Sequence, residues 1–153
     1  MSQVTLVRRI AARPSIVFDA LITSEGMRSW WGPDEGPVLS AASDATVGGR
    51  FCVRFRKADG TEHECTGEFL EIDQPRRIVM SWQWISGGPV QERERVSRLE
   101  LRLRPIDTGT ELTLIHAALY DEPSASEHDW GWGGALDKLL RRFAISPPQA
   151  SRG

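Results

Sequence analysis

The strongest constraint on this fold is a strict alternation of leucine with charged residues over residues 97–104, which read SRLELRLR. Alternation with a period of two predicts a β-strand that buries one face and exposes the other. The same pattern occurs over residues 50–56, 78–84 and 111–116, and turn-forming residues separate these segments. Consecutive strands joined by short turns predict an antiparallel sheet with one covered face.

Helical segments flank the predicted sheet. After a first strand at residues 4–10, Pro14 suits the first turn of a short helix, and Ser24 is placed to cap a second one. The apolar residues on one face of a long closing helix are spaced four, three and four residues apart: Trp132, Leu136, Leu139 and Phe143. These elements predict one α+β domain over residues 1–145, with a disordered tail at 146–153.

Composition narrows the classes of partner. The net charge of −2 and the pI of about 5.9, without a basic stripe, argue against nucleic-acid binding. No apolar run reaches the roughly 20 residues of a membrane span, and the N-terminus lacks the pattern of a signal peptide. Two cysteines do not form a disulfide framework. We therefore expect a cytoplasmic protein with free thiols, either a monomer or a homodimer.

The predicted register of one hairpin sets the relative position of the two cysteines. An Asp-Gly pair at residues 59–60 predicts a two-residue turn. In the register that this turn sets, Arg54 faces Cys65 and Cys52 faces Gly67. The cysteines are then diagonal neighbours about 7 Å apart on one face, too far for an easy disulfide. The hydrophobic pattern changes phase just after Cys65, which indicates a bulge.

Tryptophan is the unusual component of the sequence. The six tryptophans form three close pairs: Trp30 with Trp31, Trp82 with Trp84, and Trp130 with Trp132. Each indole buries a large area and brings one hydrogen-bond donor. Any one of them could be plain core, but three pairs converging on one space favour an aromatic-lined cavity.

Three glycines interrupt the closing helix, at residues 131, 133 and 134. Each costs about 1 kcal/mol relative to alanine. They predict a close approach of another backbone or room for a ligand, or else a bent or frayed first turn.

Few polar residues are placed for chemistry. His116 shares the inward face of Leu112 and Leu114, so it is expected to line a pocket, where it could hydrogen-bond a ligand or act as a base oriented by a carboxylate. Packing against a neighbouring element is the alternative. Arg8 also faces inward, and it could hold an anionic group or extend to solvent at the strand end.

The remaining histidines do not form a metal-binding pattern. His63, His116 and His128 fall in three different elements, and neither Cys65 nor Asp129 completes a ligand set at the usual spacing. The sequence contains no nucleophile motif and no cofactor fingerprint. We therefore predict no metal, no cofactor and no catalytic residue.

Several motifs, taken in order, resemble the activator-of-heat-shock-protein-90-ATPase homologue family. They are VFDA at 17–20, WWGP at 30–33, GG at 48–49, DG at 59–60, LTLIH at 112–116 and HDWGWGGALDKL at 128–139. The resemblance covers nearly all of residues 4–143. It implies a helix-grip, START-like α+β fold: a curved antiparallel sheet of six or seven strands wrapped around a long C-terminal helix, with two short helices after the first strand. It also implies a pocket and, less directly, a chaperone partner, because the eponymous protein binds its chaperone largely through a separate N-terminal domain.

The leading hypothesis is a non-catalytic domain that binds a small hydrophobic, aromatic or amphipathic ligand between the sheet and the last helix. The predicted lining residues are Trp30, Phe51, Val53, Met80, Trp82, Leu99, Leu101, Leu114, His116, Trp132 and Leu136. One alternative is a cyclase or hydrolase that uses His116 near an acid such as Glu68 or Asp129. The other is a co-chaperone-like module with an exposed apolar patch.

Overall fold

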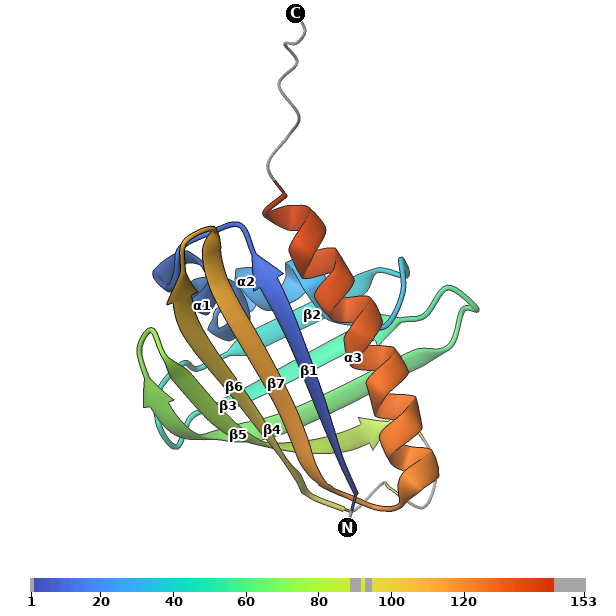
Figure 1. Cartoon of the computed structure of the whole chain (residues 1–153). Coiled ribbons are helices and arrows are strands. Elements are labelled where there is room, and N and C mark those ends of the chain that lie inside the picture. Colours follow the sequence, from blue (N-terminus) through green and yellow to red (C-terminus); the bar gives the residue numbers. More distant parts are fainter. Residues whose placement is uncertain (1, 89–91, 93–94, 145–153) are drawn as a thin grey trace, which may run out of the picture.

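The computed structural model describes residues 2–88, 92 and 95–144, and within them it contains one seven-stranded antiparallel sheet and three helices (Figure 1). The predicted tail at 146–153 lies outside the described residues. In chain order the elements are β1 (Ser2–Ile10), α1 (Pro14–Ile22), α2 (Ser24–Trp30), β2 (Val38–Ser43), β3 (Arg50–Arg56), β4 (Glu62–Asp73), β5 (Arg77–Ser86), β6 (Ser97–Ile106), β7 (Gly109–Leu119) and α3 (Glu122–Arg142).

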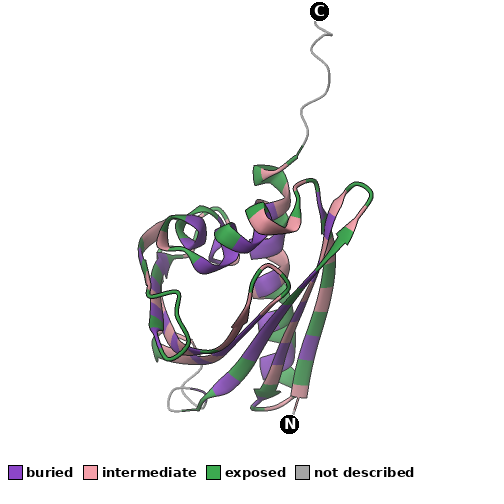
Figure 2. Ribbon diagram, turned by 90° about the vertical axis from the view of Figure 1, so that its left-hand side faces the viewer, coloured by how far each residue is buried: buried purple, intermediate pink, exposed green. Residues whose placement is uncertain are grey.

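The sheet curves around α3, with the strands in the order β1-β7-β6-β5-β4-β3-β2. Buried and exposed residues alternate along the strands, so that one face of the sheet is covered and the other is open to solvent (Figure 2). The helices α1 and α2 pack near one end of the cup, where α2 contacts both β2 and α3. The predicted helix-grip α+β fold is confirmed.

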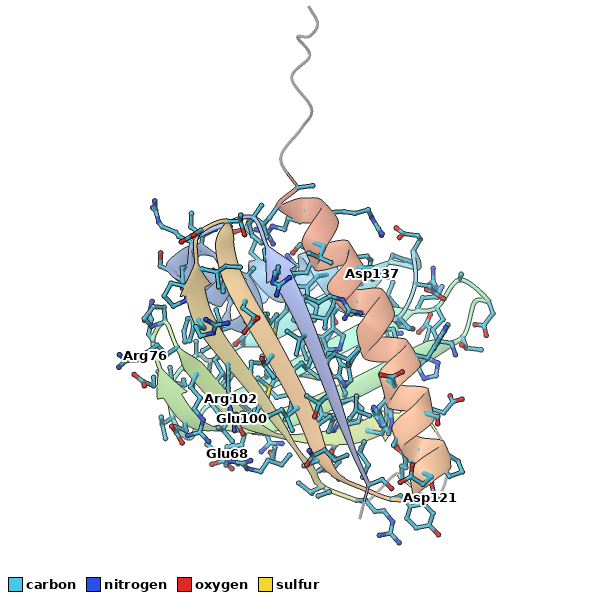
Figure 3. The ribbon with its side chains drawn as sticks, in the orientation of Figure 1. Glu68, Arg76, Glu100, Arg102, Asp121 and Asp137 are labelled. Atoms are coloured by element: carbon cyan, nitrogen blue, oxygen red, sulfur yellow. The ribbon has the colours of Figure 1, made fainter. Side chains whose placement is uncertain are left out.

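The start of α2 differs in detail from the sequence prediction. The side chain that caps α2 is Thr23 rather than Ser24, since the Thr23 hydroxyl accepts the Gly26 N–H at 3.0 Å. At the start of α3, Asp121 accepts the Ser124 N–H at 2.9 Å. Figure 3 places Asp121 at that end of the helix. A carboxylate there also interacts favourably with the helix dipole.

The β3–β4 hairpin corrects the predicted register by one residue. Its closing pair is Arg56 with Glu62, so five residues connect the strands, and the Lys57 N–H bonds the Thr61 carbonyl at 2.8 Å. Val53, not Arg54, therefore faces Cys65. A slip of one residue moves a side chain to the other face of a sheet.

The two cysteines accordingly lie on opposite faces, and both are free thiols. Cys65 is fully buried in the core, whereas Cys52 faces outward and its thiol contacts Glu64 at 3.0 Å. The prediction that they are diagonal neighbours on one face is wrong. The predicted irregularity after Cys65 is present, because the β4–β5 register shifts between Glu64 and Cys65 and again between Phe69 and Glu71.

Gly134 explains part of the glycine cluster in α3. A Cβ at Gly134 would overlap the Pro33 carbonyl group, so the helix and the 31–34 loop pack backbone against backbone. Lys138, one turn further along α3, donates to the carbonyls of Trp31 and Asp34 at 2.8 Å each. The loop is thereby fixed to the helix, and it forms one wall of the cleft described next.

Candidate functional site

An open cleft of about 100 Å³ lies between the N-terminal half of α3, the 31–33 loop and the strands β3, β4 and β5. Its lining is mostly aromatic. The residues around it are Trp31, Gly32, Pro33, Phe55, Lys57, His63, Trp82, Trp84, Gly88, Glu92, Glu127, His128, Trp130, Gly131, Trp132 and Ala135. Five of the six tryptophans therefore border one space, which supports the cavity predicted from their pairing.

The aromatic walls are packed edge to face. Trp82 meets Trp84 with ring centroids 4.7 Å apart, and Trp31 meets Trp132 at 5.2 Å. Such geometry aligns the positive edge of one ring with the negative face of the next. Trp130 is different, since 56% of it is exposed at the mouth, where the Lys57 ammonium lies 5.7 Å from its ring centroid.

His116 lies beneath the cleft, fully buried, in a complete chain of hydrogen bonds. Its Nδ1 accepts the indole N–H of Trp132 at 2.9 Å, and its Nε2 lies 2.7 Å from Ser97 Oγ. Ser97 Oγ in turn donates to the Trp82 carbonyl at 3.1 Å, so it accepts from Nε2–H. Burial, with His128 nearby, holds the pKa of His116 well below its usual value. The ring is therefore neutral, and both of its nitrogens are occupied.

A second histidine faces the cleft itself. His128 lies on α3 one turn before Trp132, and its Nε2 is 3.0 Å from Glu92 Oε1, with both side chains buried. Burial alone would raise the pKa of Glu92, but the hydrogen bond from His128 and the proximity of Ser124 and Trp84 outweigh it, so this pKa is lowered. Glu92 is thus a carboxylate, with one oxygen held by His128.

Three polar atoms of the cleft residues are buried without a hydrogen-bond partner among the described residues. They are Trp82 Nε1, Trp84 Nε1 and Glu92 Oε2. The Trp84 indole is close enough to favour the charged form of Glu92, but its N–H does not meet the carboxylate in hydrogen-bonding geometry. Unpaired buried polar atoms are rare in folded proteins, and each needs an explanation.

His63 forms part of the wall near the mouth. Its Nδ1 accepts the Gly88 N–H at 3.1 Å, and its Nε2 lies 3.1 Å from Thr61 Oγ1, which itself donates to Asp59. Burial, and to a lesser degree the charge of Lys57, lowers the pKa of His63. Its ring stacks on Phe55 at 5.4 Å, so His63 acts here as a neutral aromatic surface.

The predicted lining residues divide into two groups. Trp82 and Trp132 border the cleft. The other nine are buried in the core behind it: Trp30, Phe51, Val53, Met80, Leu99, Leu101, Leu114, His116 and Leu136. Trp30 donates its indole N–H to the Ala20 carbonyl at 2.9 Å, which fixes α1 against α2.

Other candidates from the sequence lie elsewhere. His116 bonds neither Glu68 nor Asp129, the acids proposed to orient it. Arg8 Nε lies 3.8 Å from the carboxylate of Asp137, which Figure 3 shows on α3, and Arg8 is not among the residues that line the cleft. Asp129 is exposed on α3.

The cleft residues that the sequence prediction omitted are mainly Trp31, Trp84, His128 and Glu92. Trp84 follows Trp82 by two residues on β5, and His128 precedes Trp132 by four residues on α3. Each therefore lies on the same face of its element as a predicted lining residue, and the periodicity of the sequence indicated both. Glu92 lies in the segment that connects β5 to β6, and no pattern indicated it.

Across residues 2–88, 92 and 95–144, no group of three or more His, Cys, Asp or Glu side chains is arranged to hold a metal ion. In the same part of the chain, no helix combines the length and the apolar character needed to cross a bilayer.

Solved structures with this fold come from several bacteria. A protein from Chromobacterium violaceum superposes with a TM-score of 0.78 at 22% identity, covering 95% of this chain and 100% of that one. The AHSA1 protein from Silicibacter pomeroyi gives the same TM-score and identity over 92% and 96%. The Aha1 dimer from Colwellia psychrerythraea gives 0.68 at 16% identity over 95% and 98%. At these identities, the TM-scores show that this chain shares its fold with the three proteins.

A search of curated proteins finds no match. The model of one family, described as activator of Hsp90 ATPase homolog 1-like protein, matches residues 11–144, which is most of the chain. With its helix-grip architecture and its WWGP loop packed on α3, this chain belongs to the activator of Hsp90 ATPase homolog 1-like family.

Proposed function

We propose that this chain is a non-catalytic domain that binds a small hydrophobic or amphipathic ligand in the cleft between α3 and strands β3 to β5. The observation that carries the proposal is the open cleft of about 100 Å³ that five tryptophans border. A ligand in this cleft would remove apolar aromatic surface from water, which stabilises a complex by roughly 25 cal/mol per Å² of buried apolar surface.

The composition of the cleft argues for binding rather than covalent chemistry. None of the described lining residues is Ser, Thr or Cys. His116, the base favoured from the sequence, is neutral and already bonded at both nitrogens to Trp132 and Ser97. A mostly apolar pocket with a few polar groups at fixed positions is the usual form of a small-molecule site.

The test is a titration followed by tryptophan fluorescence, because five indoles border the cleft. The panel contains fatty acids, flavonoids and single-ring aromatic compounds. A matched pair of variants locates the response: Gly131→Leu places a side chain on the cleft wall, whereas Gly133→Leu places the same side chain on α3 near Arg8, outside the cleft.

We expect saturable quenching by at least one ligand class in the wild type and in Gly133→Leu, and its loss in Gly131→Leu. Circular dichroism establishes that both variants are folded. Quenching that survives in Gly131→Leu would place the ligand elsewhere, and a flat response to the whole panel would refute the proposal.

The family description favours a second candidate, a co-chaperone-like module that stimulates the Hsp90 ATPase. The exposed Trp130 at the mouth would then contact the partner. The discriminating measurement is the ATPase rate of Hsp90 with and without this chain, in parallel with the same assay on Trp130→Ala. An increase that Trp130→Ala abolishes would favour the chaperone role over the ligand-binding role.

The two free cysteines agree with the reducing environment of the cytoplasm, where either role would be exercised.

A further inference from the structure

Lys57, at the mouth of the cleft, carries a positive charge without a counter-ion. It is half-buried, and it is the only Lys or Arg among the described residues that line the cleft. Its ammonium lies 5.7 Å from the ring centroid of Trp130. Within the described part of the chain, no carboxylate forms an ion pair with it. A half-buried cation in this position is stabilised by an anion that binds beside it.

The acidic residues around the cleft do not supply that anion. Asp59 is near enough to interact with Lys57, but it is exposed, and its carboxylate accepts two hydrogen bonds within the hairpin turn. Glu92 is paired with His128 at 3.0 Å. Glu127 also lines the mouth, but it too is exposed, so water and salt screen its charge. The ammonium of Lys57 is therefore available to an anionic group of a ligand.

His63 shows that the charge of Lys57 reaches the wall of the cleft. Burial lowers the pKa of His63, and the charge of Lys57 lowers it further. The His63 ring lines the cleft, stacked on Phe55 with the ring centroids 5.4 Å apart. An anion that pairs with Lys57 would weaken the effect of its charge on His63.

The size of the cleft restricts the rest of the ligand. Its volume is about 100 Å³, less than the roughly 150 Å³ of an engineered cavity that holds benzene. An alkyl chain is narrower than a ring, and it can follow the walls formed by Trp31, Trp84 and Trp132. Burying its methylene groups there removes apolar surface from water.

Resting on the proposed function, we propose that the ligand of the cleft is a monocarboxylate with an alkyl tail. The carboxylate pairs with the ammonium of Lys57 at the mouth. The tail lies along the aromatic walls between α3 and the strands.

Four compounds separate the charge of the ligand from its shape. Hexanoate, 1-hexanol and hexylamine share one tail and carry a negative charge, no charge and a positive charge at pH 7. Benzoate carries the charge of hexanoate on a ring. Dissociation constants are measured on the wild-type protein by calorimetry and by tryptophan fluorescence. We expect hexanoate to bind at least about fivefold more tightly than each of the other three, a factor equivalent to about 1 kcal/mol.

Two variants at one position test the ion pair. Lys57→Gln removes the charge and Lys57→Arg keeps it, and neither changes the backbone N–H of residue 57, which bonds the Thr61 carbonyl and closes the hairpin. We expect Lys57→Gln to bind hexanoate and 1-hexanol with affinities that agree within about twofold. Lys57→Arg should keep the preference for hexanoate.

The pKa of His63 gives a second readout that does not depend on affinity. It is measured by NMR titration of the ring in the wild-type protein saturated with each compound. Saturation with hexanoate should give a higher pKa than saturation with 1-hexanol, because only the carboxylate offsets the charge of Lys57. Equal values would place the carboxylate away from Lys57 and overturn the inference.

The remaining outcomes separate this inference from the proposed function. If 1-hexanol, hexylamine or benzoate binds as tightly as hexanoate, the inference is overturned and the binding function stands. A preference for hexanoate that survives in Lys57→Gln has the same consequence, because the anion then pairs elsewhere. Flavonoids that bind in the cleft while all four small compounds fail also overturn it. Failure of every ligand, large and small, overturns the inference and the proposed function together.

Discussion

Replacing Gly134 by alanine should destabilise the protein, although the same change one residue earlier should stabilise it. Alanine is favoured over glycine inside a helix by about 1 kcal/mol. At Gly133 the new Cβ would lie 3.8 Å from Arg8 Nη2, an ordinary contact with the end of a flexible side chain. Gly133→Ala should therefore gain close to the full helix propensity.

At Gly134 the new Cβ would overlap the backbone carbonyl of Pro33, which cannot rotate away. The loop is also held to α3 by Lys138, whose ammonium donates to the Trp31 and Asp34 carbonyls. Either the loop shifts and lengthens those bonds, or α3 moves from the sheet. Overpacking costs about 1–3 kcal/mol, and overlap with backbone belongs at the upper end. After the gain in propensity, Gly134→Ala should lose about 2 kcal/mol in the free energy of unfolding.

The assay is urea unfolding of the wild type, Gly133→Ala and Gly134→Ala, followed by far-UV circular dichroism and tryptophan fluorescence. Equal m-values in the three proteins establish that differences in midpoint report differences in stability. The expected order of midpoints is Gly133→Ala, wild type, Gly134→Ala. If Gly134→Ala is as stable as Gly133→Ala, the packing of the Pro33 backbone on α3 is not what requires glycine there.

Three further predictions test other parts of the structure, two by substitution and one by chemical labelling. Trp132→Phe leaves Nδ1 of buried His116 without its donor, so the free energy of unfolding, measured in urea, should fall by about 1–3 kcal/mol beyond the effect of the smaller ring. Burial opposes ionisation of Glu100, but hydrogen bonds from neighbouring arginines outweigh it and lower its pKa from 4.5 to about 2. At about 1.4 kcal/mol per pKa unit, Glu100→Gln should lower the free energy of unfolding at pH 7 by about 3 kcal/mol. Because the folded pKa is depressed, that stabilisation is complete above about pH 4.5 and disappears as the pH falls through about 2. Burial raises the pKa of the Cys52 thiol to about 11, and Cys65 is inaccessible, so neither should react quickly with a thiol reagent at pH 8 until the protein unfolds.

For each of these three predictions, one result would contradict the reasoning. Trp130→Phe, at an exposed position, is the control for Trp132→Phe. If both variants lose the same free energy of unfolding, the buried hydrogen bond to His116 does not stabilise the fold. A pH-independent deficit in Glu100→Gln would mean that the pairs with Arg77 and Arg102 do not stabilise the fold (Figure 3). Fast labelling of Cys65 in the native state would contradict its burial.

The strands were predictable because each has one covered face, so alternation marked them directly. Leu99, Leu101 and Leu103 are all buried, whereas Arg102 and Arg104 are exposed. The β3–β4 register was not predictable from its turn, because an Asp-Gly pair occurs in both two-residue and longer hairpin loops. The one-residue difference moved Cys65 from the outer face to the core.

The candidate site was harder to predict than the fold for a related reason. The alternation of residues along a strand separates inward from outward side chains, but it does not indicate which inward side chains are covered by others. Most of the cup is filled: Phe51, Met80 and Leu114 are buried in one continuous core. The cleft remains open at the end where Trp84 and the N-terminal half of α3 meet, and its position depends on how far each strand extends.

The two histidines show what periodicity cannot supply. Parity placed His116 correctly on the inward face, yet its chemistry is set by Trp132, a residue on another element that occupies Nδ1. A reaction using His116 as a base would first have to break that bond, leaving a buried indole N–H unpaired at about 1–3 kcal/mol. It would then have to place a charge on a fully buried ring, which burial strongly opposes. His128, in contrast, borders the cleft, and the Glu92 carboxylate holds its Nε2. A search for relatives with catalytic activity should therefore compare the residues that replace His128 and Glu92, because these two side chains face the open space and His116 does not.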